Sequence, residues 1–155
     1  MLADTFAGNS SILHYSEKFQ SFKALQERNV ICFKSDDLED YNLPFSLREL
    51  QDSLDSSLDT TPGPDDIAYE MLKHLSQHAI EILLTMFNKI WVSEIFPSSW
   101  GQAIVIPILK PGKDDSNPDS YRLIALTSCV CKTMERMVNN RLVYYVEQNN
   151  ILSEF

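Results

Sequence analysis

The chain has 155 residues, of which 22 are acidic and 13 are Lys or Arg, so its formal net charge is −9. This length accommodates one domain with a real core, and a 44% hydrophobic content excludes a disordered or fibrous protein. Net acidity argues against a nucleic-acid partner only on average, because binding depends on where the charges lie.

No apolar run approaches the ~20 residues that span a bilayer, and the N-terminus lacks the features of a signal peptide. These observations predict an intracellular protein, in cytoplasm or nucleus, that is not secreted and has no membrane partner. The cysteines are Cys32, Cys129 and Cys131. An odd count with one C-x-C pair matches neither a disulfide framework nor a zinc pattern, which favours free buried thiols.

The first sixty residues contain one strongly predicted helix. Residues 15–28 leave open a peripheral helix or an extended arm, and residues 30–40 predict a loop with a solvated acidic end. Ser46 and Glu49 then form a capping box, and Phe45 and Leu50 are spaced as a hydrophobic staple. A helix over residues 46–58 follows, with one apolar face formed by Leu47, Leu50, Leu54 and Leu58.

Residues 61–66, Thr-Pro-Gly-Pro-Asp-Asp, predict a rigid turn, because each proline restricts the residue before it. Asp65 and Asp66 would begin a helix over residues 65–75, where carboxylates complement free N–H groups. This capping role explains the pair more simply than catalysis does. Ser76 is the predicted N-cap of a helix over residues 76–93.

His74 and His78 are spaced i, i+4, which could place both on one metal ion, but no third ligand is evident. We therefore expect surface histidines and no metal site. The apolar side chains of residues 76–93 form a stripe typical of a core-facing helix.

Two apolar runs, residues 103–109 and 121–126, flank a cluster of Pro, Gly, Asn and Asp, which predicts a β-hairpin over residues 101–127. Lys110 and Lys113 lie at its tip, and Arg122 lies on the return strand.

Helical spacing after Ser128, a predicted N-cap, indicates a helix over residues 128–149. Between Trp100 and Arg141 there are six cations and four anions, a local charge of +2 (6 − 4). The predicted fold class is α+β, mostly helical with one antiparallel hairpin.

Four blocks of sequence, in order and with their spacing, resemble the reverse transcriptase (RNA-directed DNA polymerase) of non-LTR, jockey-like retrotransposons. The blocks are TPGPDDIAYEMLKHL, IFPSSWGQAIVIPILKPGKD, SYRLIALTS and KTMERMVNNRL. The preceding segment YNLPFSLRELQDSL also matches. The resemblance covers almost the whole chain. It departs from the family at Asp66, where the family usually has Gly, and at Leu123, where it usually has Pro.

The resemblance implies part of a right-hand polymerase. Residues 1–60 would be an N-terminal extension, and residues 61–155 the start of the reverse transcriptase domain, truncated after its fingers. Lys110, Lys113 and Arg122 would contact the triphosphate of the incoming nucleotide, since cations neutralise charge that develops during phosphoryl transfer. The turn motif of Pro62, Gly63, Pro64 and Asp65 would contact the template. Without the resemblance, solvated lysines at a hairpin tip are the simpler interpretation.

In the complete family enzyme, aspartates of the palm hold Mg²⁺, and the partners are dNTP and an RNA or DNA template-primer. No block of this chain matches those aspartate motifs, so we expect no catalytic residue, no bound cofactor and no polymerisation by the chain alone. We expect at most weak, salt-sensitive nucleic-acid binding, and self-association through the apolar surface of the hairpin.

Three functional hypotheses follow. The chain is an N-terminal piece of a retrotransposon polymerase; or it is a domesticated, non-catalytic module that binds a protein or nucleic acid; or it is a helical scaffold without polymerase ancestry. The first hypothesis accounts for all four blocks of sequence.

Overall fold

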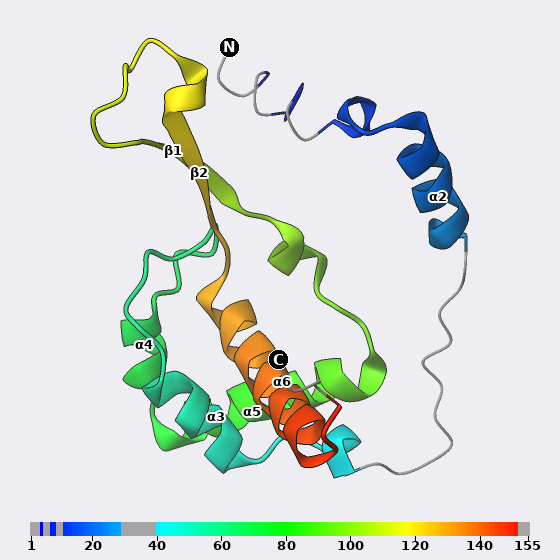
Figure 1. The fold of residues 1–155 in the computed structure, drawn as a ribbon. Helices are drawn as coiled ribbons and strands as arrows, with labels where there is room; N and C mark the ends of the chain where they lie inside the picture. The colour runs from blue at the N-terminus through cyan, green and yellow to red at the C-terminus, as the bar shows by residue number, and fades with distance from the viewer. Residues whose placement is uncertain (1–3, 5–6, 9–10, 29–39, 152–155) are drawn as a thin grey trace. The chain divides into compact units, whose positions relative to one another are not determined.

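The structure is a computed structural model that describes residues 4, 7–8, 11–28 and 40–151 (Figure 1). The chain divides into two compact units, which we describe separately. The first unit contains residues 1–37 and 108–122, and the second contains residues 38–107 and 123–155.

The N-terminal part of the first unit is helical where it is described. After the 3₁₀ turn η1 (Ile12–His14), helix α2 (Glu17–Glu27) begins at Ser16, whose hydroxyl accepts from the Phe19 N–H at 3.3 Å. The residues therefore form a helix and not an extended arm. None of the 11 residues of α2 is buried. Cys32 and most of the predicted acidic loop lie outside the described residues.

The second unit begins with the 3₁₀ turn η2 (Asp40–Asn42) and helix α3 (Leu47–Asp55). The predicted capping box is confirmed, with Ser46 and Glu49 each accepting a backbone hydrogen bond from the other. The predicted end at residue 58 is wrong. The helix stops at Asp55, because the Ser56 and Ser57 hydroxyls bond the carbonyls of the preceding turn, and Leu58 is 78% exposed.

Helix α4 (Tyr69–Lys73) is shorter than the predicted helix over residues 65–75, and the prediction that Asp65 and Asp66 cap it is wrong. Its N-cap is Ala68, which makes no side-chain hydrogen bond. Asp66 has a φ of 56°, in the left-handed region, which cannot continue into a helix. Helix α5 (Gln77–Ser93) begins at Ser76 as predicted, with the Ser76 hydroxyl accepting from the Ala79 N–H.

The predicted hairpin is present between α5 and the last helix. The 3₁₀ turn η3 (Ser98–Gly101) precedes strand β1 (Ile104–Leu109), and the 3₁₀ turn η4 (Pro118–Ser120) precedes strand β2 (Tyr121–Leu126). The two strands pair in one antiparallel sheet. All six residues of β1 are exposed, and its five large apolar side chains keep between 37% and 53% of their surface accessible.

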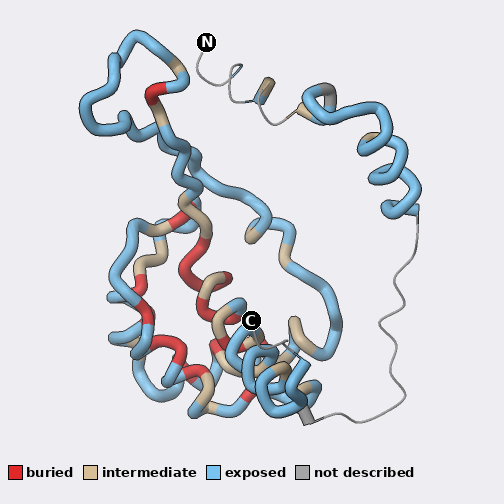
Figure 2. The backbone as a smooth tube through the Cα atoms, viewed as in Figure 1, coloured by how far each residue is buried: buried red, intermediate tan, exposed pale blue. Residues whose placement is uncertain are grey.

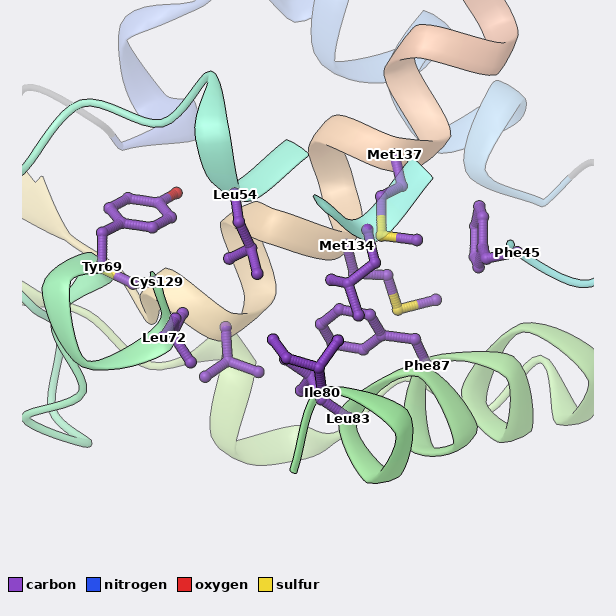
Figure 3. Close-up of a cluster of buried hydrophobic side chains, with 12 residues drawn as sticks. Phe45, Leu54, Tyr69, Leu72, Ile80, Leu83, Phe87, Cys129, Met134 and Met137 are labelled. Atoms are coloured by element: carbon purple, nitrogen blue, oxygen red, sulfur yellow. The ribbon is translucent and has the colours of Figure 1, made fainter. Parts of the chain in front are cut away.

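Helix α6 (Cys129–Gln148) is the element on which the second unit is assembled. Ser128 caps it as predicted, accepting from the Cys131 N–H at 3.3 Å. The helix contacts α3, α4 and η2, and Figure 2 shows its buried half beginning at the N-terminal end. Ile80, Leu83 and Phe87 of α5 point toward Met134 and Met137 of α6 (Figure 3). The mostly helical α+β class is confirmed. The buried core consists of Phe45, Leu50, Leu54, Tyr69, Leu72, Ile80, Leu83, Phe87, Cys129, Val130, Met134 and Met137.

Arg141 ties the end of α6 to the start of α3. Its guanidinium donates to both carboxylate oxygens of Glu49, at 2.5 and 3.0 Å, and lies 4.3 Å from the centre of the Phe45 ring. Only 15% of the Arg141 side chain is exposed. The guanidinium also donates to the backbone carbonyls of Tyr41, Leu43 and Pro44.

Glu49 belongs at once to the capping box and to this ion pair. Partial burial by itself raises the pKa of Glu49, but hydrogen bonds from Arg141 and from the Ser46 N–H and hydroxyl, together with the Arg141 charge, outweigh it. The result is a pKa lowered from 4.5 to about 2. The carboxylate therefore stays ionised throughout the pH range in which the protein would act.

Candidate nucleotide and nucleic-acid contacts

The tip of the hairpin begins with a tight turn over residues 110–113. The Lys113 N–H donates to the Lys110 carbonyl at 3.2 Å, and Gly112 has a φ of 71°. Proline at the second position and a left-handed glycine at the third are the requirements of a type II turn. The Lys-Pro-Gly-Lys sequence thus brings two lysines to the two ends of one turn.

The three predicted nucleotide-binding cations all belong to the first unit and are exposed. Lys110 donates from Nζ to the Asp119 carbonyl at 2.9 Å, and its backbone N–H donates to the Ser120 carbonyl, which closes the loop. Among the described residues, the side chains of Lys113 and Arg122 have no hydrogen-bond or ion-pair partner. They remain available to an external anion.

The same loop carries carboxylates that offset these cations. The Asp114 carboxylate accepts hydrogen bonds from the Ser116 N–H and hydroxyl, which lower its pKa, so it is ionised at neutral pH. Asp115 and Asp119 follow in the loop. The hairpin tip therefore carries both positive and negative charges. Binding of an anion there would be weak and sensitive to salt.

Two of the six cations counted between Trp100 and Arg141 serve the fold instead. Arg141 is paired with Glu49, as described above. Arg136 donates to the Ser53 carbonyl at 2.6 Å, and its guanidinium lies 5.7 Å from the centre of the Tyr69 ring. The local positive charge that the sequence suggested is thus partly internal to the second unit.

The predicted template motif, in the second unit, forms a β-turn closed by a hydrogen bond from the Asp66 N–H to the Gly63 carbonyl at 3.1 Å. Pro64 occupies the second position, which proline favours. Gly63 is buried and lies in close contact with residues 127–128, which connect β2 to α6. A Cβ atom at Gly63 would lie 2.5 Å from the Thr127 carbonyl carbon and 2.6 Å from the Ser128 nitrogen.

Asp65 also contacts the connection between β2 and α6. Its Oδ2 accepts a 2.5 Å hydrogen bond from the Ser128 hydroxyl, across 63 positions of sequence. Its Oδ1 accepts from the Ile67 N–H at 3.3 Å, which stabilises the turn itself. Ser128 is only 3% exposed. The carboxylate thus holds the residue that caps α6, and its negative charge lies near the N-terminus of that helix, where it is favourable.

Asp66 occupies a backbone position that suits glycine, which is the residue that the resembled family usually has there. Asp tolerates the left-handed region better than most residues, but at a steric cost that glycine does not have. We expect Asp66→Gly to raise the free energy of unfolding by about 0.5–1 kcal/mol. Urea denaturation would measure this change, and Asp66→Ala, expected to destabilise, is the control. A destabilised Asp66→Gly variant would contradict the argument.

An apolar cavity of about 530 Å³ adjoins the turn within the second unit. Its apolar lining includes Leu72, Leu83, Met86 and Val130. Pro64 and Asp65 border it, as do Trp100 and Gln102 before β1 and Ser128 after β2. The two ends of the hairpin and the turn therefore meet around one cavity.

The other predicted chemical groups do not converge. His74 ends α4, where its ring Nδ1 is 2.7 Å from the Glu70 carbonyl, and His78 lies in the first turn of α5. Cys129 and Cys131 are buried and free; burial and the nearby Glu135 raise the pKa of Cys131 to about 12.

Within the described ranges, no group of three or more His, Cys, Asp or Glu side chains is placed to hold a metal ion. No helix there has both the length and the apolar character that crossing a membrane requires.

The order of these features, a Pro-Gly-Pro-Asp turn held against the start of a helix and a lysine-tipped hairpin, agrees with the resemblance seen in the sequence. No family model matches the chain. Relatives found by comparison show that the chain is homologous to part of the RNA-directed DNA polymerases of non-LTR retrotransposons.

Three such relatives come from Drosophila melanogaster. The chain is 35% identical over 112 residues to the probable RNA-directed DNA polymerase from transposon BS, over 72% of the chain. It is 31% identical over 147 residues to that of transposon X-element, over 91% of the chain. It is 32% identical over 98 residues, which are 63% of the chain, to the RNA-directed DNA polymerase from mobile element jockey. The matches span only 12%, 16% and 11% of these relatives.

Proposed function

We propose that this chain is the fingers portion of a retrotransposon reverse transcriptase and that its hairpin contacts the incoming nucleotide and the template. The observation that carries this proposal is the type II turn that brings Lys110 and Lys113 together, in a chain homologous to such polymerases. Residues 1–60 would be the extension before the fingers and residues 61–155 the start of the polymerase domain.

Each cation suits a different part of this task. Arg122 offers a planar fork that can bind two phosphate oxygens, whereas Lys113 is a flexible point charge. Both are exposed and have no side-chain partner among the described residues. Lys110 is partly engaged by the Asp119 carbonyl, so it would orient the loop as well as contribute charge.

Replacing Lys110, Lys113 and Arg122 together by alanine is expected to abolish salt-sensitive binding of a fluorescent RNA–DNA duplex, because phosphate contacts release counterions. The matched control replaces Lys18, Arg48 and Lys89, which are exposed cations on helices and change the net charge equally. Fluorescence anisotropy at several salt concentrations measures binding. Equal loss in both variants would mean that net charge, and not the hairpin, governs binding.

The chain would supply contacts and not the polymerisation chemistry, because no block of its sequence matches the aspartate motifs that the resemblance implies for the palm. We expect no incorporation of dNTP above a heat-inactivated control in a primer-extension assay with Mg²⁺. Incorporation by the purified chain would contradict this expectation. Self-association through the exposed hairpin also stays a prediction, which sedimentation would test.

The second candidate function is a domesticated module that binds a partner without catalysis. The exposed apolar surface of β1 favours an interaction of some kind, since five of its six residues are large and apolar. Duplex binding that depends on the three cations would favour the polymerase proposal over this one.

A further inference from the structure

We infer that Asp65 is a positioning residue: together with Gly63 it holds the connection between β2 and α6, and so fixes the part of β2 that belongs to the second unit, residues 123–126, against the start of α6. This role differs from the template contact that the resemblance implies for the turn. It goes beyond the proposed function, and neither the inference nor its test depends on that function.

The first observation is that the connection is very short. Strand β2 ends at Leu126 and α6 begins at Cys129, so only Thr127 and Ser128 lie between them. A two-residue connection transmits the position of the helix start directly to the strand. Since Cys129 and Val130 are buried in the core, α6 provides a fixed base.

The second observation is that the turn holds both residues of the connection. Gly63 lies so close to the Thr127 carbonyl and the Ser128 nitrogen that no side chain fits between them. Asp65 binds the Ser128 hydroxyl at 2.5 Å, and that hydroxyl also accepts from the Cys131 N–H. Ser128 therefore has its donor directed to the turn and its acceptor directed to the helix.

The third observation concerns what remains for a template. Gly63 is buried, and each carboxylate oxygen of Asp65 already accepts a hydrogen bond from this chain. Among the contacts described, only Pro62 and Pro64 of the motif neither accept a hydrogen bond nor contact the connection between β2 and α6. Gly63 and Oδ2 of Asp65 thus contact the connection between β2 and α6, and Oδ1 of Asp65 stabilises the turn itself.

The other end of the hairpin has its own anchor. Trp100, just before β1, lies edge-on to Phe87 of α5 and to Phe96, with ring centres 6.2 and 5.6 Å apart. With one end of the hairpin held by packing and the other by the Asp65–Ser128 hydrogen bond, loss of that bond would loosen β2 specifically.

The test measures the hairpin base relative to the core in the full 155-residue chain. Spin labels would be attached through a keto amino acid at Leu123 in β2 and at Lys89 in α5, both exposed, so that the native cysteines are untouched. Double electron–electron resonance then reports the distance distribution. We expect one narrow peak in the otherwise unchanged chain and its loss in Asp65→Ala and in Ser128→Ala.

The double variant is expected to broaden the distribution no further than either single variant, because both remove the same bond. Asp65→Asn, which keeps an acceptor oxygen, should restore the narrow peak. The control is Lys73→Ala, which removes contacts to Asp59 and the Ser57 carbonyl away from the hairpin. Its peak should stay narrow even where its thermal stability falls.

A broad distribution in the otherwise unchanged chain, an unchanged peak in Asp65→Ala, or equal broadening in Lys73→Ala would overturn the inference. Duplex binding is recorded separately on the same proteins. If the distance distributions are as expected but none of these proteins binds the duplex, the positioning role of Asp65 is supported and the proposed function is refuted.

Discussion

Replacing Arg141 by alanine is expected to lower the free energy of unfolding by roughly 3 kcal/mol or more, because it removes one member of a largely buried ion pair. The change leaves the Glu49 carboxylate without its cation and removes the hydrogen bonds that the guanidinium donates to three backbone carbonyls. Urea denaturation followed by circular dichroism measures the loss.

Arg141→Lys tests the geometry of the same site. Lysine keeps the charge but cannot contact a carboxylate and several carbonyls through one planar fork, so we expect only partial recovery. The matched control is Arg48→Ala, whose exposed i, i+4 pair with Asp52 is expected to contribute less than about 1 kcal/mol. Similar losses of unfolding free energy in Arg141→Ala and Arg48→Ala would contradict the interpretation that the Arg141–Glu49 pair stabilises the fold more than an exposed pair does.

The pH dependence of stability follows from the same pair. Because the pKa of Glu49 is lowered in the folded chain from 4.5 to about 2, its contribution is fully present above pH 4.5. That contribution is lost as the pH falls through the folded value. Glu49→Gln should therefore flatten the profile of unfolding free energy against pH between these two values.

Replacing Gly63 by alanine is the second change with a large expected effect. The added methyl group would lie 2.5–2.8 Å from three backbone atoms of Thr127 and Ser128, which cannot rotate away as a side chain can. We expect a loss of roughly 3 kcal/mol, the upper end of the usual cost of overpacking. The turn would also move away from the connection and weaken the Asp65–Ser128 hydrogen bond.

Gly101→Ala is the control within the same chain, because a Cβ atom there would meet nothing within 4 Å. Thermal melts would compare the two variants, and the amide resonances of Thr127 and Ser128 would report the local shift. If Gly63→Ala were as stable as Gly101→Ala, the close approach of the turn to the connection would be disproved.

Local signals made much of the fold predictable. The capping box at Ser46 and Glu49 and the serine caps at Ser76 and Ser128 use contacts within three residues, so sequence reveals them directly. The Lys-Pro-Gly-Lys turn is equally local, since proline and glycine each set one backbone angle. The hairpin and the helices on either side of it followed from these signals and from the spacing of apolar side chains.

Other features were decided by contacts between residues far apart in the sequence. Asp65 was assigned to a helix start because the pattern fits a cap, but in the structure it binds Ser128 and leaves α4 to begin without a side-chain cap. Arg141 and Arg136 both contribute to the local charge of +2 between Trp100 and Arg141, yet each donates hydrogen bonds to backbone carbonyls elsewhere in the second unit. No local pattern distinguishes an arginine that faces solvent from one that ties two helices together.

Sequence by itself therefore determined where α3, α5 and α6 begin, where the hairpin lies and which family of polymerases the chain resembles, because those depend on neighbouring residues. Only the tertiary structure decided which charged groups are free and that the Pro-Gly-Pro-Asp turn is held against the hairpin base. The physical reason is that a hydrogen bond or a steric contact requires two groups within a few ångströms, and for Asp65 and Ser128 folding alone brings that about.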